Sequence, residues 1–371
     1  MKVAVTGADG FLGWHLQVRA KALRPDLEIV PVAQADWPQL GELLTGVDAV
    51  IHVAGINRDT DEAVRDGNIA LAKDLVRAVN GTPRLVYANS IQVGNGTPYA
   101  IGKAGASDVL GEAAARWGTP YADVRLPNLF GEHGRPAYNS FVATFVASAV
   151  AGETPGSLVD RPIGLLHAQR AAQALLDGLD GSGVVEPAPY ETSVARVWET
   201  LAEFRSGYAG ADVPDVTDDF RLDLFNTYRA GLFPVGYPLA LTPRADERGR
   251  LVESIRSHGA GGQVFVSTTN QGFTRGEHFH LRKIERFVVL AGRAEIALRK
   301  MCTDEVVSFV VSGDEPVAID MPTMWTHNIT SLDGEATTLF WTNELFDPDH
   351  PDTYWENVDA GMGKDAPKKT V

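Results

Sequence analysis

Two groups of residues in this chain have the spacing that catalytic chemistry requires, and they lie about 180 residues apart. The first is Tyr99-Ala-Ile-Gly-Lys103, with Ser90 upstream. The second is His278-Phe-His280, followed by Glu285 and, further on, by His327. The first group is typical of hydride transfer on a dinucleotide and the second of a metal site in a β-barrel. The chain is therefore predicted to carry out two steps on one substrate.

The tyrosine and the lysine of the first group are four positions apart and therefore share one face of a helix. A Tyr-x-x-x-Lys pair also arises by chance as a pair on a helix surface. Here the tyrosine follows a serine at the end of an apolar strand by nine residues, in a chain that opens with a glycine-rich turn. This combination favours a catalytic role for Ser90, Tyr99 and Lys103.

The glycine-rich turn, Gly7-Ala-Asp-Gly10-Phe-Leu-Gly13, follows an apolar run at residues 2–6 and precedes an amphipathic pattern at residues 14–23. This order predicts a strand, a tight turn and a helix. Glycines in such a turn let the backbone approach a pyrophosphate, whose charge the helix N-terminus stabilises. Residues 48–55 and 85–90 are typical of the fourth and fifth strands of a doubly wound sheet, with Ser90 at the carboxyl edge where ligands bind.

These motifs resemble the extended short-chain dehydrogenase/reductase superfamily, in which a segment like Arg125-Leu-Pro-Asn128-Leu-Phe-Gly131 lines the nucleotide-sugar pocket. The resemblance implies that Tyr99 is the general acid/base, that Lys103 lowers the pKa of Tyr99, and that Ser90 hydrogen-bonds the substrate oxygen. The hydride would come from a nicotinamide ring. The implied cofactor-binding residues are Gly7, Gly10, Phe11, Leu12, Gly13, Ala54, Gly55, Tyr99 and Lys103, and the implied substrate-binding residues are Asn57, Arg58, Arg125 and Asn128.

Two positions depart from this superfamily. In its sugar dehydratases an Asp-Glu pair follows the strand-end hydroxyl and drives elimination, whereas Ser90 is followed by Ile91 and Gln92. We therefore expect ketone reduction or 4-epimerisation instead of dehydration. At the exit of the second strand, an acidic residue favours NAD and an arginine favours NADP. Gln34 is neither, and Asp36 lies two positions later.

A Pro/Gly-rich stretch at residues 231–238 precedes a change in the sequence pattern. Helical patterns dominate before it, and short β-rich runs at near-regular spacing follow residue 242, which is typical of a sandwich or barrel. The runs are 262–267, 286–290, 294–298, 306–311 and 337–341. The predicted fold is a Rossmann-like, doubly wound α/β domain at residues 1–242, followed by an all-β barrel at residues 243–371.

The histidines of the second group, His278 and His280, lie two apart on a predicted strand and so point to the same side. Glu285 and His327 would come from neighbouring strands and complete a set of donors that suits Zn²⁺, Fe²⁺, Mn²⁺ or Ni²⁺. The alternative is surface histidines with a carboxylate nearby by chance. With a glycine at position 292, the spacing resembles both motifs of the cupin family, a jelly-roll barrel, although Met324 stands where the second motif usually has glycine.

A reductase followed by a metal cupin resembles the bifunctional capsular-polysaccharide enzymes that make the precursor of UDP-N-acetyl-L-fucosamine. The likeness covers nearly the whole chain, with specific segments at 52–58, 127–131, 138–140, 143–145, 326–329, 343–348 and 351–354. It implies a zinc cupin that epimerises C3 of a UDP-4-keto-6-deoxy-HexNAc, a reductase domain that then reduces C4 with NADPH, and a homodimer. NADH stays open, because Gln34 stands where the family carries a basic residue nearby.

Composition narrows the class of protein further. A length of 371 residues allows two domains, and the net charge of −15 argues against a nucleic-acid partner. No window reaches the length of a membrane span, so no membrane partner is expected, and the chain enters a strand directly, without a cleavable signal pattern. The single cysteine, Cys302, excludes an intramolecular disulfide, which favours a cytoplasmic location.

Three other functions stay open at this stage. The first is a single-activity nucleotide-sugar reductase or 4-epimerase whose cupin domain binds a ligand or mediates dimerisation. The second is a non-catalytic dinucleotide sensor, a class that usually lacks the tyrosine–lysine pair, and the third is an iron cupin oxygenase. The sequence also leaves open the nucleotide, UDP or dTDP, and the carbon base, for which Lys283, His280 and Glu277 are nearby candidates.

Overall fold

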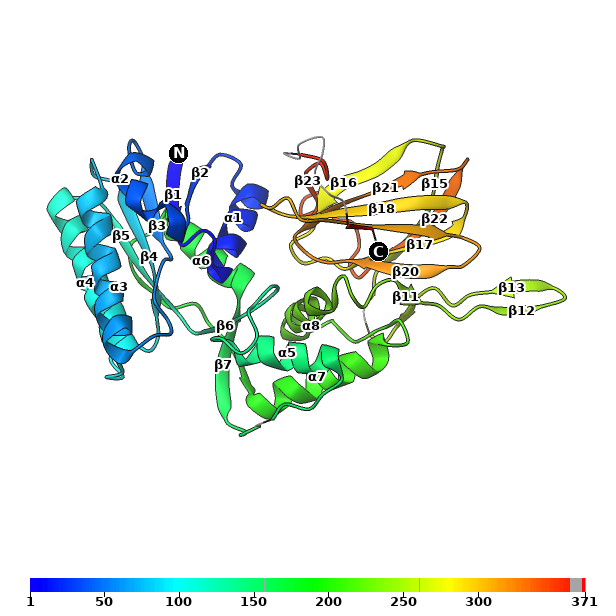
Figure 1. Cartoon of the computed structure of the whole chain (residues 1–371), viewed down its shortest axis with the longest axis horizontal. Coiled ribbons are helices and arrows are strands. Elements are labelled where there is room, and N and C mark those ends of the chain that lie inside the picture. Colours follow the sequence, from blue (N-terminus) through cyan, green and yellow to red (C-terminus); the bar gives the residue numbers. More distant parts are fainter. Residues whose placement is uncertain (157, 260, 361–368, 371) are drawn as a thin grey trace. The chain divides into compact units, whose positions relative to one another are not determined.

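The computed structural model describes residues 1–156, 158–259, 261–360 and 369–370 (Figure 1). The chain divides into two compact units. The first unit contains Met1–Thr144 and Val159–Val194, and the second contains Phe145–Leu158 and Ala195–Val371. Among the described residues, no helix combines the length and the apolar character that crossing a membrane requires.

The first unit is built on a six-stranded parallel sheet with the strand order β2-β1-β3-β4-β5-β8. Its central strands are almost entirely buried, which is expected where helices cover both faces of a parallel sheet. The strands are β1 (Lys2–Thr6), β2 (Glu28–Val32), β3 (Ala49–His52), β4 (Arg84–Ser90), β5 (Tyr121–Leu126) and β8 (Gly183–Val185). The predicted doubly wound sheet is confirmed.

The two strands expected at 48–55 and 85–90 are β3 and β4, the third and fourth strands along the chain, and not the fourth and fifth. The reason is the segment between β2 and β3. It forms the 3-10 helix Gln34–Gln39 and the short helix α2 (Leu40–Leu43) in place of a further strand. A proline inside the 3-10 helix, Pro38, lacks the N–H group that a sheet ladder would need.

Helices pack on both faces of this sheet (Figure 1). One face is covered by α1 (Phe11–Leu23) and α6 (Ala168–Asp177), and the other by α3 (Asp61–Ala78) and α4 (Pro98–Trp117). Threonine hydroxyls at the starts of α3 and α4 each accept a backbone hydrogen bond at 3.3 Å, which satisfies an otherwise unpaired helix N–H. A small sheet of β6 (Asn128–Phe130), β7 (Pro162–His167) and β9 (Tyr190–Ser193) completes the unit.

The second unit contains two β-sheets that we name after one strand each. The β16 sheet has the order β23-β16-β21-β18-β19-β24, and the β17 sheet has the order β11-β20-β17-β22-β15. The five predicted β-rich runs correspond to β15, β17, β18, β19 and β22, which confirms the all-β barrel. The strands are β11 (Leu239–Ala240), β15 (Gln263–Thr269), β16 (Thr274–Phe279), β17 (Glu285–Ala291), β18 (Arg293–Lys300), β19 (Val306–Ser312), β20 (Val317–Met321), β21 (Trp325–Ser331), β22 (Ala336–Thr342), β23 (Tyr354–Trp355) and β24 (Lys369–Thr370).

Helical segments before residue 242 also belong to this second unit: most of α5 (Phe141–Ala151), α7 (Val194–Tyr208) and α8 (Asp219–Leu232). A buried ion pair of the barrel bonds the end of α7 and the residues that follow it. Arg286 on β17 binds Asp320 on β20 through two hydrogen bonds of 2.6 and 2.9 Å. The hydroxyl of Tyr208 donates to Asp320 at 2.6 Å, and Arg286 donates to the carbonyl of Ala211 at 2.7 Å. Helix α7 and the residues after it therefore provide hydrogen-bond partners for Arg286 and Asp320, which are buried in the barrel.

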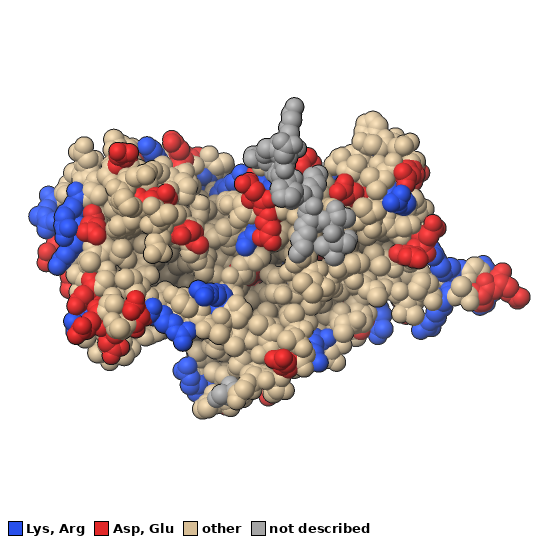
Figure 2. Space-filling model, viewed as in Figure 1, with Lys and Arg blue, Asp and Glu red and all other residues tan. Residues whose placement is uncertain are grey.

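Two short pairings complete the second unit. Strands β12 (Arg244–Asp246) and β13 (Gly249–Leu251) form an exposed hairpin, and β10 (Asp212–Val213) pairs with β14 (Arg256–Ser257). On the face shown in Figure 2, acidic and basic side chains are interspersed, and the hairpin carries both signs.

Candidate active sites

The glycine-rich turn has the geometry that a close backbone approach requires. Gly7 has a φ of +70°, and a Cβ atom on it would lie 2.8 Å from the backbone nitrogen of Ala54. A Cβ atom on Gly13 would lie 2.0 Å from the carbonyl oxygen of Gly7. Only glycine fits at these positions without a shift of backbone. The turn leads into α1, whose N-terminal N–H groups are suited to a phosphate.

The loop after β3 lies beside this turn, and the amide of Asn68 on α3 fixes its shape. Asn68 donates to the carbonyl of Ile56 at 2.8 Å and accepts from the nitrogen of Ile56 at 3.1 Å. A Cβ atom on Gly55 would lie 3.9 Å from the amino group of Lys103. Two of the predicted cofactor-binding segments, the glycine turn and Ala54-Gly55, are thus adjacent to each other and to the predicted lysine.

Ser90, Tyr99 and Lys103 come together at the carboxyl edge of the sheet. Ser90 ends β4, and the other two residues lie on one face of α4. Burial raises the pKa of Tyr99, and the neighbouring Ser90 side chain partly opposes this effect. Lys103 is 4% exposed, donates to the carbonyl of Ala88 at 2.6 Å and lies 4.3 Å from the ring centroid of Tyr87.

The buried position of Lys103 controls its protonation. Removal from water destabilises the ammonium form and lowers the pKa of Lys103 to about 7, while the negative charge of Asp123 acts in the opposite direction. His52, also buried, has its pKa lowered to about 3 by desolvation and by the charge of Lys103. His52 is therefore neutral at pH 7. The site can hold a proton on Tyr99 beside a cation whose charge depends on pH near neutrality.

The predicted substrate-binding residues have separate hydrogen-bond partners. Arg58 donates to the carbonyls of Ala137 and Tyr138 at 2.8 and 3.0 Å. Arg125 binds the carboxylates of Asp123 and Glu186 at 3.1 and 3.4 Å. Asn128 and Asn57 are exposed, and Asn128 donates to the carbonyl of Gly164 at 3.5 Å. The described contacts do not join these four residues to one another.

The exit of β2 carries acidic groups. The carboxylate of Asp36 accepts from the nitrogen of Ala33 at 2.9 Å and so caps its own 3-10 helix. The carboxylate of Asp9, in the glycine turn, accepts from the nitrogen of Gln34 at 3.3 Å. The sequence argument considered position 36 and overlooked Asp9, whose place in the turn was the only available signal. Asp9 therefore lies beside the exit of β2, the part of this fold where an acidic residue usually bonds the ribose of a dinucleotide.

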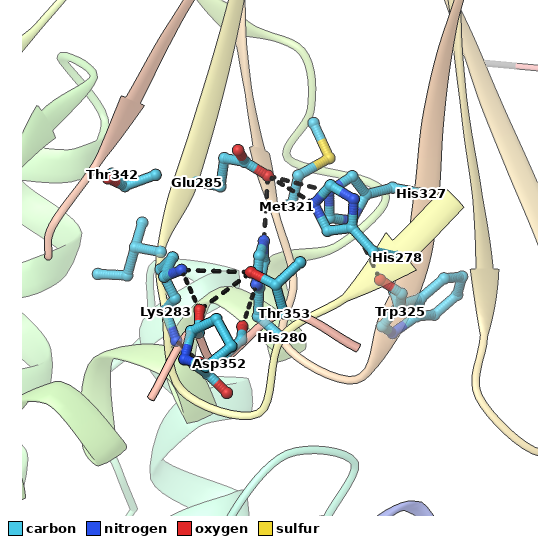
Figure 3. A network of polar contacts seen from close by, with 12 residues as sticks. His278, His280, Lys283, Glu285, Met321, Trp325, His327, Thr342, Asp352 and Thr353 are labelled. Atoms are coloured by element: carbon cyan, nitrogen blue, oxygen red, sulfur yellow. Dashed lines mark hydrogen bonds and ion pairs between the residues drawn. The ribbon is translucent and has the colours of Figure 1, made fainter. Parts of the chain in front are cut away.

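The predicted metal ligands converge in the barrel (Figure 3). One donor atom from each of four residues lies within 4.8 Å of the others. The Oε2 atom of Glu285 lies 3.6, 3.1 and 3.0 Å from the Nε2 atoms of three histidines. These residues are His278, His280 and His327. Three imidazoles and a carboxylate around one point form a donor set that fits Zn²⁺ or a similar divalent ion.

The surroundings orient two of these imidazoles. The Nδ1 atom of His280 lies 2.6 Å from the carbonyl of Asp352, and that of His327 lies 3.3 Å from the carbonyl of Trp325. With an ion bound, a proton on Nδ1 would leave the Nε2 lone pair available to the ion. Burial raises the pKa of Glu285, but its interactions with the three histidines outweigh this effect and hold the pKa well below its usual range. The carboxylate therefore remains ionised.

Two details of the cluster differ from the sequence-based expectation. His278 pairs with His327 across β16 and β21, whereas Glu285 lies on β17 in the other sheet and not on a neighbouring strand. His280 follows the end of β16. Met324, where the cupin motif usually has glycine, has a φ of +61°. This left-handed conformation explains the usual glycine, and Met324 adopts it while donating to the carbonyl of His280 at 2.7 Å.

The candidate carbon bases of the barrel have polar partners of their own. Lys283 donates to the carbonyl of Pro351 at 2.6 Å, and Glu277 accepts from Asn328 at 2.7 Å and from the nitrogen of Val358 at 2.6 Å. His280 belongs to the metal cluster. Asp352, which sequence reasoning missed, accepts from the backbone nitrogens of residues 281–283 and so holds the turn between His280 and Glu285.

Comparisons with known proteins agree with both halves of this description. The NAD dependent epimerase/dehydratase family matches residues 3–173, and the polysaccharide biosynthesis C-terminal domain matches residues 244–354. The UDP-2-acetamido-2,6-beta-L-arabino-hexul-4-ose reductase of Pseudomonas aeruginosa is 32% identical over 97% of this chain and 100% of its own length.

Solved structures show the same likeness. The capsular polysaccharide assembling protein CapF from Staphylococcus aureus is 30% identical, covers 96% of this chain and 100% of its own, and superposes with a TM-score of 0.62. CapF with the inhibitor 3-isopropenyl-tropolone gives 28% identity, the same coverage and a TM-score of 0.56. With 96% of this chain covered, the match extends over both units. The chain therefore belongs to the family of capsular-polysaccharide nucleotide-sugar epimerase/reductases, in which an extended short-chain reductase precedes a cupin barrel.

Proposed function

We propose that this protein is a bifunctional nucleotide-sugar enzyme. Its barrel epimerises C3 of a UDP-4-keto-6-deoxy-HexNAc or a related NDP-4-keto sugar, and its first unit then reduces the C4 ketone with NAD(P)H. One observation carries the proposal: Ser90, Tyr99 and Lys103 meet at a sheet edge beside a glycine turn, and the same chain holds a buried His₃Glu cluster. The name of the Pseudomonas relative, a reductase of a UDP-hexul-4-ose, supports the choice of substrate.

The chemistry of the sugar sets the order of the two steps. A proton on C3 is acidic only while C4 is a ketone, because the carbonyl oxygen carries the charge of the resulting enolate. Reduction of C4 to an alcohol removes that acidity. Epimerisation must therefore come first, and reduction fixes the new configuration at C3.

In the reduction, Tyr99 donates its hydroxyl proton to the C4 oxygen, while Ser90 hydrogen-bonds the same oxygen and orients it. A bound nicotinamide cofactor would supply the hydride, so that ketone, NAD(P)H and a proton would give alcohol and NAD(P)⁺. The ammonium of Lys103 stabilises the phenolate that Tyr99 becomes, because opposite charges favour the ionised form. The glycine turn and Ala54-Gly55 bind the dinucleotide, and Asn57, Arg58, Arg125 and Asn128 face the sugar nucleotide in this proposal.

In the epimerisation, His278, His280, Glu285 and His327 would hold one divalent ion, which we propose to be Zn²⁺. Such an ion supplies Lewis-acid stabilisation of a developing enolate oxygen. The Nδ1 contacts of His280 and His327 keep their Nε2 atoms directed at the cluster. Asp352 holds the intervening turn in place.

The proposal extends to the organisation of the enzyme. Residues 1–242 supply the reductase chemistry and residues 243–371 the metal chemistry, the enzyme is a homodimer, and it works in the cytoplasm. NADPH is the proposed cofactor on the family likeness. The carboxylate of Asp9 near Gln34 is a reason to test NADH beside it, because a negative charge there disfavours a 2′-phosphate.

One experiment tests the whole proposal. The protein is incubated in D₂O with UDP- and dTDP-4-keto-6-deoxy sugars, with NADPH, NADH or no cofactor, and the products are identified by NMR. We expect deuterium at C3 without cofactor, and a C3-inverted alcohol with it. A reduced sugar that keeps its C3 configuration and carries no deuterium would favour the single-activity reductase, and tightly held NAD without net consumption would favour the 4-epimerase.

A further inference from the structure

A buried carboxylate lies beneath α4, next to the lysine of the reductase site. Asp123 is on β5, opposite Tyr87 in the parallel register of β4 and β5, and it is 4% exposed. Lys103 lies over the ring of Tyr87. Tyr87 packs in the core cluster that α4 covers, and side chains opposite each other on neighbouring strands share a face. Asp123 and Lys103 are therefore on the same side of the sheet.

Two side chains from β4 and β5 hold this carboxylate. Asn89 donates to Oδ1 of Asp123 at 2.7 Å, and Arg125 donates to Oδ2 at 3.1 Å. Arg125 also reaches Glu186, and its side chain is 32% exposed, whereas that of Asp123 is 6% exposed. A buried carboxylate is costly unless it is hydrogen-bonded and paired. The chain meets both conditions without using Lys103 as the direct partner, because the amino group donates to the carbonyl of Ala88.

Other titratable groups around Lys103 do not supply a negative charge at neutral pH. His52 on β3 is neutral, since its pKa is lowered to about 3. Tyr87 on β4 and Tyr99 on α4 both have raised pKa values, chiefly through burial, and stay protonated. Asp123 on β5 is the charged group whose field opposes the desolvation of Lys103.

We propose that Asp123 is a positioning residue for the reduction: its carboxylate keeps Lys103 in the ammonium form, which in turn lets Tyr99 release its proton to the C4 oxygen. This inference rests on the proposed reductase function. No bond to substrate is involved, so the effect of Asp123 reaches the reacting atoms through Lys103. Position 123 would thereby set the upper end of the pH range in which the reductase works.

The sign of the effect follows from the charges. Burial lowers the pKa of Lys103 to about 7, and Asp123 raises it. With Asp123 neutralised, Lys103 would lose its proton at a lower pH. Reductase activity, which needs the ammonium form, would then fall at a lower pH. Loss of one nearby opposite charge is expected to shift the pKa of a buried group by about one unit.

The test compares Asp123→Asn with Tyr121→Phe. Asparagine keeps the shape and can still accept from Asn89. Tyr121 precedes Asp123 on the same face of β5, and its hydroxyl bonds Ser107 at 2.8 Å, so its loss removes a neutral hydrogen bond without a change of charge. The measurement is kcat for oxidation of NADPH with the 4-keto sugar, from pH 5 to 10. We expect the alkaline limb of Asp123→Asn to move down by about one unit, and that of Tyr121→Phe to stay in place.

A second variant should shift the alkaline limb of the pH profile in the opposite direction. Arg125→Gln removes a partly exposed cation that neutralises Asp123, so the alkaline limb should move to higher pH, whatever happens to KM. This variant keeps the inference testable if Asp123→Asn fails to fold. Alkaline limbs that coincide with the wild type in the folded variants would overturn the role of Asp123.

A readout independent of activity separates this inference from the proposed function. With ¹³C-labelled lysine, the ε-carbon signal of Lys103, assigned by its loss in Lys103→Arg, can be titrated by NMR. Its midpoint should fall in Asp123→Asn and rise in Arg125→Gln. If no 4-keto sugar is reduced but the midpoint moves as expected, the proposed function fails and the link between Asp123 and Lys103 stands. An unmoved midpoint overturns the inference even in an active reductase.

Discussion

Gly13 lies so close to Gly7 that a methyl group on Gly13 would stand 2.0 Å from the carbonyl oxygen of Gly7. Gly13→Ala must therefore displace the turn that would hold the pyrophosphate. Overpacking of this kind costs about 1–3 kcal/mol, so we expect affinity for NADPH to fall by about tenfold to a hundredfold. Fluorescence titration of NADPH measures it. Gly41→Ala on α2 is the matched control, since its Cβ would meet only Ala78 at 3.9 Å; equal losses in both variants would contradict the prediction.

Tyr99→Phe should abolish cofactor oxidation, because it removes the proton donor and leaves the ring in place. A loss of about 10²-fold or more is expected in kcat. Deuterium exchange at C3 should continue, since that step is assigned to the barrel. Cofactor consumption is followed by absorbance and exchange by NMR on the same samples. Loss of both activities would show that the two chemistries are not separate.

His278→Ala and His327→Ala should each lower metal content and C3 exchange together, because each removes a donor that the barrel cannot replace. Reduction of a ketone that already has the final C3 configuration should survive. His350→Ala is the control, since the His350 side chain is 87% exposed and contacts Asp347. Metal analysis and exchange rates check the result. Metal loss with unchanged exchange would make the ion structural and favour the single-activity reductase.

Asp320→Asn should lower the free energy of unfolding of the second unit more than the substitution of an exposed carboxylate does. It leaves Arg286 buried without its ionised partner, which typically costs about 3–5 kcal/mol. Asp333→Asn removes the partner of Arg293 in an exposed pair, where about 0–1 kcal/mol is expected. Denaturant unfolding monitored by circular dichroism compares the two. Similar midpoints for both variants would mean that the buried pair contributes little.

The parts of the structure that the sequence predicts well depend on local spacing. Strand, glycine turn and helix follow one another within residues 2–23, and Tyr99 and Lys103 share a helix face by their separation alone. The β-rich runs after residue 242 likewise predict the strands of the barrel from local sequence alone. These patterns express the 3.6- and 2-residue periods of helix and strand, which need no knowledge of distant segments.

Contacts between segments far apart in the sequence could not be predicted from these local patterns. Asp352 contacts the ring of His280 through its carbonyl from 72 residues away and holds the following turn through its carboxylate, and nothing in its own neighbourhood marks it. Glu285 reaches the histidines across the barrel and not along a sheet. Asp123 sits between Ala122 and Val124 in a buried strand, a polar interruption that could have been noticed in the sequence. The second unit groups α7 and α8 with the barrel. Tyr208 of α7 bonds Asp320, and Arg229 of α8 bonds the carbonyl of Met321, contacts that only the folded chain brings together.

The origin of the four donors has a consequence for the barrel as a whole. Three imidazoles are carried by β16 and β21 or lie just beyond β16, whereas the carboxylate is carried by β17 in the facing sheet. An ion bound by all four residues would link the β16 sheet to the β17 sheet. Because such an ion binds the folded state in preference to the unfolded chain, unfolding would become harder with the logarithm of the free-ion concentration. The concentration of free metal in the cell would then affect the stability of the folded barrel as well as its catalytic activity.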